Sequence, residues 1–222
     1  PNHTMGIVER PKWYKLQFSE NPEKHVMIRA LEKIDDPGVF FSTINGLENS
    51  KEALLFIHGF NVKFDSGIRR AAQISYDMDF GGVSLAYSWP SQGKVRDYNK
   101  DKSNADWSFP HLAEFLTELS SKGKFDRIHI MAHSMGTRVL CKAIKEARNS
   151  GADLKLANVI LAAPDLDSQV FKEQYFDHVD DSSERLTVYV SSDDAALKVS
   201  SKINGFSRLG LSNPNIVVIP DM

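Results

Sequence analysis

The chain has 222 residues, with 29 acidic and 27 basic side chains and a formal net charge of −2. This length suits one α/β domain, and the near-neutral charge, without a basic stripe, argues against a nucleic-acid partner. The longest apolar runs are strand-sized and fall short of the roughly 20 residues that a membrane helix needs, so the sequence predicts no transmembrane segment.

The ends and the single cysteine leave the compartment open. Cys141 is the one cysteine, so no intrachain disulfide forms, but proteins without disulfides occur in every compartment. Because the chain begins with Pro1, we expect a processed N-terminus and a domain that is either cytoplasmic or exported after loss of a signal. We expect a single domain over 1–222, with an N-terminal segment (1–50), a core (51–222) and a C-terminus that is cut short. The sequence gives no indication of the oligomeric state.

The first 50 residues predict an early strand, and the rest alternates between strands and helices. His25 to Leu31 alternates, with Val26, Ile28 and Ala30 on one face. Short apolar runs typical of buried strands, and stripes at helical spacing, then follow in turn. We expect strands at 53–57, 83–87, 125–131, 159–162, 186–190 and 216–219, and helices around 68–76, 112–119, 139–147 and 196–203. Residues 91–108 read as a long polar loop that caps the site or lies in solvent.

This alternation predicts an α/β fold, a mostly parallel sheet with helices on both faces. Ligands of such sheets bind at the carboxyl ends of the strands. The residues that end each strand are therefore the candidates for chemistry.

The segment 130–137, Ile-Met-Ala-His-Ser-Met-Gly-Thr, joins a strand to a striped helix. This is the context of a nucleophile elbow, a sharp turn that exposes a serine hydroxyl above the sheet. Such a turn needs small residues two before and two after the serine, here Ala132 and Gly136. The sequence therefore predicts Ser134 as a nucleophile, with the Met135 N–H facing a developing oxyanion. The alternative is a serine that only caps a helix.

A second strand ends in His58-Gly59-Phe60-Asn61. A His-Gly pair at this point starts the oxyanion loop of serine hydrolases, so we expect the Phe60 N–H to be the second oxyanion donor. We expect the His58 side chain itself to be a buried, hydrogen-bonded core histidine. Trp89, after the next strand, is predicted either to line a substrate pocket or to belong to the core.

The chain resembles a family of uncharacterised bacterial α/β hydrolases, known as a domain of unknown function. The likeness runs from about Gly6 to Gly210. It is carried by Glu9-Arg10-Pro11, by 56–61, by Arg70-Ala71-Ala72-Gln73, by Ser88-Trp89-Pro90-Ser91, by 132–136, by Ala163-Pro164-Asp165 and by 194–197. The resemblance implies the α/β-hydrolase fold and a hydrolase-type site, and it implies no particular substrate.

Two acidic residues are candidates for the third position of a Ser-His-acid triad. Asp194 follows the strand at 186–190, the usual place of the acid in this fold, and the segment around it matches the family's pattern. Asp165 follows the preceding strand, where some lipases carry the acid. Both come after the serine in the chain, and we favour Asp194.

The base departs from the pattern, since no histidine follows His178. The resemblance implies a Gly-His pair after the last strand, so we expect the catalytic histidine beyond Met222. His178, in an acidic segment read as a loop, and His133, beside the serine, are weaker substitutes. His111 and His129 are read as helix-surface and strand residues. No metal-ligand spacing and no glycine-rich phosphate loop is present, so the sequence predicts neither metal nor cofactor.

The sequence thus predicts a serine hydrolase that cleaves an ester, thioester or related acyl bond of a small-molecule substrate through an acyl-enzyme on Ser134. A binding module that has lost the chemistry is the first alternative, because fold alone does not prove function. An acyltransferase on the same scaffold is the second.

Overall fold

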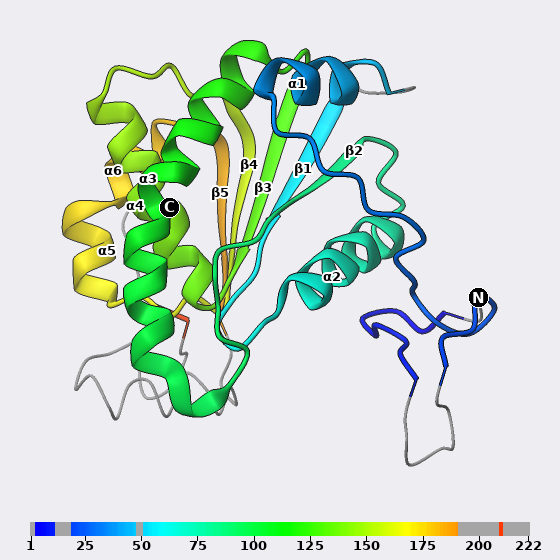
Figure 1. The fold of residues 1–222 in the computed structure, drawn as a ribbon. Coiled ribbons are helices and arrows are strands. Elements are labelled where there is room, and N and C mark those ends of the chain that lie inside the picture. Colours follow the sequence, from blue (N-terminus) through cyan, green and yellow to red (C-terminus); the bar gives the residue numbers. More distant parts are fainter. Residues whose placement is uncertain (1–2, 12–18, 48–50, 191–208, 211–222) are drawn as a thin grey trace.

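A computed structural model of the chain describes residues 3–11, 19–47, 51–190 and 209–210. Its centre is a five-stranded parallel sheet in the order β2-β1-β3-β4-β5 (Figure 1). The strands are β1 (Glu52–Ile57), β2 (Val83–Tyr87), β3 (Arg127–His133), β4 (Leu156–Ala162) and β5 (Ser183–Tyr189). All five were predicted from the sequence, to within a few residues at their ends.

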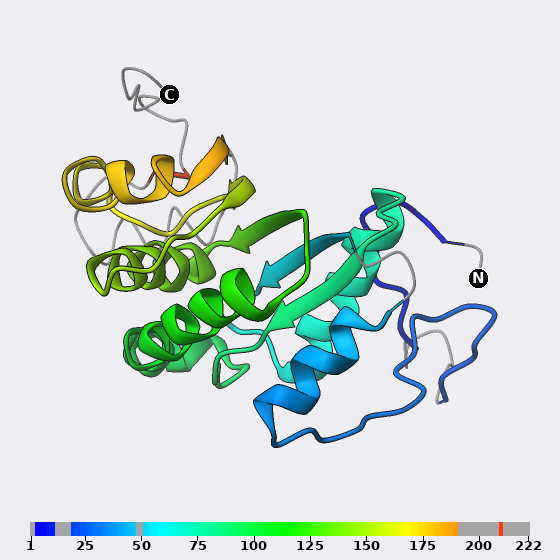
Figure 2. The ribbon, with the colours of Figure 1, turned by 90° about the horizontal axis from the view of Figure 1, so that it is seen from above.

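Helices lie on both faces of the sheet, as Figures 1 and 2 show. One face carries α3 (Tyr98–Lys122), α4 (Met135–Asn149), α5 (Ser168–Gln174) and α6 (Phe176–Asp180). The other face carries α2 (Phe64–Asp77), which packs against β1 and β2. A short helix, α1 (Pro37–Asn45), contacts α3 through the rings of Phe40 and Phe115. This is the two-sided α/β architecture that the alternating pattern predicts.

The main core lies between the sheet and the pair α3 and α4. The stripe predicted on α4 is wholly inside it, since its five residues are each at most 2% exposed. They are Val139, Leu140, Ala143, Ile144 and Ala147. Burying such side chains stabilises the fold by about 1.5–3 kcal/mol each for the larger ones, so α4 is firmly anchored behind the turn that begins it.

The strand order reverses between β1 and β3. From β1 the chain passes to β2 at one edge, and then crosses back to place β3 on the other side of β1. The connections that leave β1 and β3 therefore run to opposite faces and open a crevice at the carboxyl ends of these strands. Both motifs singled out in the sequence, at 58–61 and 132–136, stand at this crevice.

Two sequence-based expectations are wrong. The early strand at 25–31 is absent; this segment instead crosses α2, where Arg69 Nε donates to the Val26 carbonyl at 3.0 Å. The burial of the segment does not follow its alternation, since Val26, Met27 and Ile28 are all half-buried and Ala30 is exposed. The polar loop expected at 91–108 is only partly a loop, because α3 begins at Tyr98 after a 3-10 turn at Val95–Asp97.

The expected helix at 196–203 and strand at 216–219 lie outside the described residues. Among the helices that the structure describes, none is both long and apolar enough to cross a membrane.

Candidate active site

Ser134 occupies the one-residue turn between β3 and α4. Its backbone has φ 51° and ψ −121°, although a serine rarely adopts a positive φ. Such strain costs of the order of 1–3 kcal/mol and persists only where the surroundings enforce it. The strand, the strained serine and the following helix together have the form of the predicted elbow.

Close packing explains why the flanking residues are small. A Cβ on Gly136 would lie 2.4 Å from the His58 carbonyl oxygen and 2.8 Å from that of Ile57, so α4 crosses the end of β1 with no room for a side chain. Ala132, two residues before the serine, is fully buried. The small residues read from the sequence are thus required by the approach of helix and strand.

The backbone of the turn is fixed by the end of β4. Ser134 N–H donates to the Ala162 carbonyl at 2.9 Å, and the Asp165 N–H donates to the Ser134 carbonyl at 3.2 Å. The Thr137 hydroxyl donates to the same Ser134 carbonyl at 2.6 Å. These bonds hold the strained residue in place before any ligand arrives.

The loop that follows β1 lies against the serine. A Cβ on Gly59 would come within 3.0 Å of the Ser134 Cβ, so the Gly59–Phe60 peptide is a direct neighbour of the elbow. Among the described residues, the N–H groups of Phe60 and Met135 have no hydrogen-bond acceptor. Met135 N–H is also at the first position of α4, where the helix dipole favours negative charge. Both amides are therefore available as oxyanion donors.

His58 is a core histidine, as its sequence context suggested. It is 2% exposed, with Nδ1 2.9 Å from the Gly59 carbonyl oxygen and Nε2 3.2 Å from Ser88 Oγ. Burial holds its pKa below the ordinary value, which favours the neutral ring. Trp89 stacks on His58 and donates from Nε1 to the His58 carbonyl at 2.7 Å. At 2% exposure Trp89 belongs to the core and does not line the cavity described below.

A buried carboxylate, Asp101, ties the loops after β1 and β2 together. Its oxygens accept from Ser91 Oγ at 2.6 Å, from Gln92 N at 2.7 Å and from Asn61 N at 3.3 Å (Asn61 has φ 59°). Asp101 is fully buried in the first turn of α3. The sequence analysis placed Asp101 in a capping loop and missed this role, because its partners lie up to 40 residues away.

Of the two candidate triad acids, the structure describes Asp165 but not Asp194. Asp165 is 5% exposed, follows β4 and accepts a hydrogen bond from the Tyr98 hydroxyl at 2.9 Å. Its backbone contact with Ser134 makes it a neighbour of the elbow. Asp194 lies outside the described residues.

The histidines other than His58 divide by position. His178 lies in α6, not in a loop, and lines a cavity with Arg148 and Asn149, at the end of α4 opposite Ser134. A substitute role for His178 as the base is therefore incompatible with the fold. His129 bonds Asn158 within the sheet, the His111 ring contacts that of Trp107 at a tilt of 60°, and His133 lines a cavity beside the elbow.

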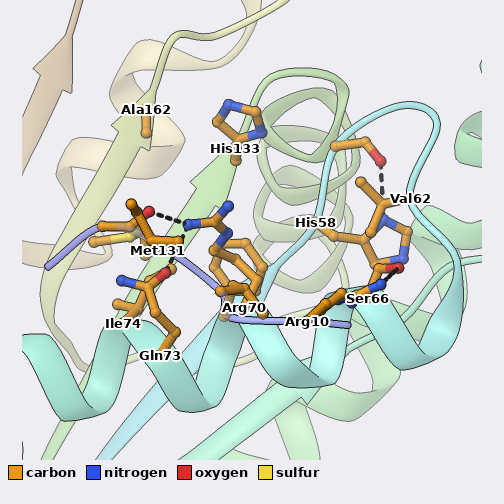
Figure 3. Close-up of a pocket in the computed structure, with 15 residues that line it drawn as sticks. Arg10, His58, Val62, Ser66, Arg70, Gln73, Ile74, Met131, His133 and Ala162 are labelled. Atoms are coloured by element: carbon orange, nitrogen blue, oxygen red, sulfur yellow. Dashed lines mark hydrogen bonds between the residues drawn. The ribbon is translucent and has the colours of Figure 1, made fainter. Parts of the chain in front are cut away.

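That cavity has a volume of about 960 Å³ and lies between α2, residues 6–10 and the sheet (Figure 3). Ligand pockets of proteins are typically about 300–1,000 Å³. In the part of the chain that the structure describes, no group of three His, Cys, Asp or Glu side chains is arranged to hold a metal.

Comparison with known proteins finds a curated relative and several similar solved structures, two of which are described below. Over 140 residues the chain is 26% identical to an uncharacterized protein of Nostoc sp., a match that covers 52% of this chain and 36% of that protein. The chain thus spans about a third of the length of this relative.

One similar structure is a brefeldin A esterase, described as a bacterial homologue of human hormone-sensitive lipase. It is 13% identical with a TM-score of 0.36, and the match covers 60% of this chain and 37% of that one. The other is a Trichoderma reesei cutinase in complex with a phosphonate inhibitor, 15% identical with a TM-score of 0.40, over 73% of this chain and 72% of that one.

The family model described as alpha/beta hydrolase of unknown function, DUF900, matches residues 41–217. That range contains the whole sheet, the elbow and the loop after β1. The chain therefore belongs to this family of α/β hydrolases of unknown function.

Proposed function

We propose that the protein is a serine hydrolase that cleaves an ester, thioester or related acyl bond, with Ser134 as nucleophile. The observation that carries the proposal is the left-handed conformation of Ser134 between β3 and α4, at the crevice where the strand order reverses. A helix cap needs no such strain, because capping serines have an extended backbone. Strained residues of this kind cluster at functional sites.

In the proposed reaction, Ser134 Oγ attacks the carbonyl carbon of the substrate while a histidine takes the serine proton. The Phe60 and Met135 N–H groups stabilise the oxyanion, a contribution of about 3 kcal/mol per donor. The bond from carbon to the leaving group then breaks, and the leaving group receives the proton from the histidine. Water attacks the acyl-enzyme and gives its proton to the same histidine, which passes it to Ser134 Oγ as the bond from Ser134 Oγ to the acyl carbon breaks and the acid is released.

We propose Asp194 as the acid that orients this histidine, and Asp165 as a brace of the elbow. The contact of Asp165 with the Tyr98 hydroxyl and its backbone bond to the Ser134 carbonyl support a structural role. Asp194→Asn is expected to lower kcat by about 10⁴-fold, as expected when a triad acid loses its charge. Asp165→Asn is expected to act mainly on stability. The reverse result would move the acid to Asp165.

The proposal is tested by labelling the full-length protein with an alkyl phosphonate that reacts with activated serines. Peptide mass analysis should find the phosphonyl group on Ser134, and Ser134→Ala should be unlabelled and lose about a thousandfold or more of kcat on short-chain esters. Ser103→Ala is the matched control, because this hydroxyl lies on exposed α3 surface and bonds only the Asn99 carbonyl. It should label like the parent.

Two outcomes would replace the proposal. Folded full-length protein that stays unlabelled would favour a binding module without chemistry. Labelled protein that forms products with an added alcohol or amine instead of water would be an acyltransferase.

Labelling of His133→Gln at the parent rate would show that His133 is not the base.

A further inference from the structure

Two of the sequence segments that carry the family likeness meet in the structure, although nothing in the proposed reaction uses them. Arg10 comes from the N-terminal segment, and Arg70 and Gln73 come from α2. All three line the cavity of about 960 Å³ beside the elbow (Figure 3). Segments 60 residues apart in the chain therefore form one wall.

The cavity is positively charged. Its lining contains two arginines and no aspartate or glutamate. Arg10 is partly neutralised, because its Nη1 lies 3.5 Å from Asp65 Oδ2. Arg70 has no carboxylate partner among the described residues. The charge of the cavity thus rests mainly on Arg70.

The Arg70 guanidinium is held in position by neutral groups. Its Nη1 donates to the Gly6 carbonyl at 3.0 Å and to Gln73 Oε1 at 2.7 Å. Gln73 is 4% exposed and donates in turn to Asp77, which also accepts from the Gly6 N–H. These bonds use one of the three guanidinium nitrogens, and Figure 3 shows the side chain extending from α2 toward His133. A fixed guanidinium with unused N–H groups matches the geometry of a carboxylate or phosphate.

The cavity adjoins the proposed nucleophile. Gly59 and His133 line it, and a Cβ on Gly59 would come within 3.0 Å of both His133 Nδ1 and the Ser134 Cβ. Phe56, Met131 and Ala162 add an apolar floor from the sheet. A molecule that fills the cavity therefore contacts Arg70 and also two neighbours of Ser134, Gly59 and His133.

We propose that this cavity binds the anionic end of the substrate, a carboxylate or phosphate group held by Arg70, with an apolar linker between that group and the bond that is cleaved. The proposal rests on the function proposed above and adds the substrate class: acyl compounds that carry a negative charge.

The first experiment compares two esters on full-length protein that differ only in the charge, monoethyl adipate and ethyl hexanoate. The carboxylate should raise kcat/KM by about tenfold, the lower end for a hydrogen bond to a charged group, since Arg70 is exposed to water. Arg70→Gln should abolish this preference. Arg148→Gln, at the opposite end of α4, should keep the preference. Equal rates on the two esters in the parent would overturn the proposal.

The second experiment needs no catalysis. Adipate and inorganic phosphate are titrated separately into Ser134→Ala protein by calorimetry, with and without Arg70→Gln. Binding that Arg70→Gln weakens by about tenfold supports the site, and the tighter of the two probes gives the anion. If Ser134 is labelled by phosphonate but neither probe binds, the anion site is wrong and the hydrolase stands. If a probe binds in an Arg70-dependent way but Ser134 resists labelling, the hydrolase is wrong and the anion site stands.

Discussion

Asp101 is the residue on which the shape of the oxyanion loop depends. A fully buried carboxylate accepts from the backbone of Asn61 and Gln92 and from the Ser91 hydroxyl. Ser91 Oγ in turn accepts from Val62 N at 3.2 Å. The C-terminal half of the 59–62 loop, Asn61 and Val62, is thereby tied to α3, and the Phe60 N–H directly precedes this tie.

Asp101→Asn is expected to lower kcat by about ten- to a hundredfold with little change in KM, because the Phe60 N–H would lose its fixed position. An amide also puts an NH₂ group beside donors, so stability should fall by about 1–3 kcal/mol. Steady-state kinetics on a neutral ester and urea unfolding measure the two effects.

The matched control is Asp106→Asn on the same helix. Asp106 bonds Arg138 and Lys142 at the surface, away from the loops. It should leave kcat unchanged. A loss of stability in Asp101→Asn without any change in kcat would show that the loop does not depend on this residue.

At the scale of elements, the N-terminal segment is attached to α2 by a charged cluster. His3 contacts Glu9 at 2.9 Å and also Asp77, and Gly6 N–H donates to Asp77 at 2.6 Å. Hydrogen bonds with Glu9 and Asp77 raise the pKa of His3 above 6.5. Burial alone would raise the pKa of Glu9, but the hydrogen bonds from the Thr4 N–H and from His3 outweigh it and hold that pKa below 4.5. The pKa of Asp77 lies below 3.8, mainly because its carboxylate accepts from the Gly6 N–H.

These shifts predict a pH window for the attachment of the segment. Because docking raises the pKa of His3, protonated His3 stabilises the docked state at every pH below the histidine pKa of the undocked chain. This stabilisation is lost as the pH rises through the raised pKa of the docked state. The ionised carboxylates of Glu9 and Asp77 stabilise the docked state at pH values above their pKa in the undocked chain. This stabilisation is lost as the pH falls through their lowered pKa values. Docking should therefore be tightest between about pH 4.5 and 6.5, and the protection factors for amide exchange of residues 4–9, which correct for the intrinsic pH dependence of exchange, should be largest there. In His3→Gln the loss of protection on the alkaline side should disappear.

Most elements could be predicted because their signals are local. The sheet strands are short apolar runs, and the α4 stripe has a clear helical period. The part of α3 from 98 to 108 was missed because its buried face includes Asp101 and Ser108, polar residues that hide the period. The segment 25–31 has the alternation of a strand. A strand also needs an adjacent strand with which its backbone can form hydrogen bonds, and the local sequence does not show whether one is present.

The candidate site divides in the same way. The elbow and the His-Gly loop are contiguous motifs, so they could be read directly. The bond from Asn61 to Asp101 joins residues 40 positions apart, and the cavity brings together Arg10 and Arg70, which are 60 positions apart. Both follow only from the way the chain is folded.

At the scale of the whole molecule, Cys141 reports on global unfolding. It is the only cysteine of the sequence, it is fully buried in α4, and burial raises the pKa of its thiol to about 12. The thiolate is the form that attacks thiol reagents, so in native protein Cys141 should react only when the core opens.

With Ellman's reagent, Cys141 should therefore stay unmodified in buffer and react fully in denaturant, with a midpoint that matches the loss of circular dichroism. Ser121→Cys, at an exposed position of α3, provides a thiol that reacts at once. Rapid modification of native Cys141 would mean that α4 separates from the sheet without general unfolding.

The Gly6, Ile7 and Val8 wall of the cavity belongs to a stretch that precedes every strand of the sheet. One wall of the proposed binding cavity thus comes from ahead of the sheet, while Arg70 and the other walls come from α2 and the strands. An exchange of this leading stretch between relatives would reshape that wall and leave Arg70, Ser134 and the loop after β1 as they are.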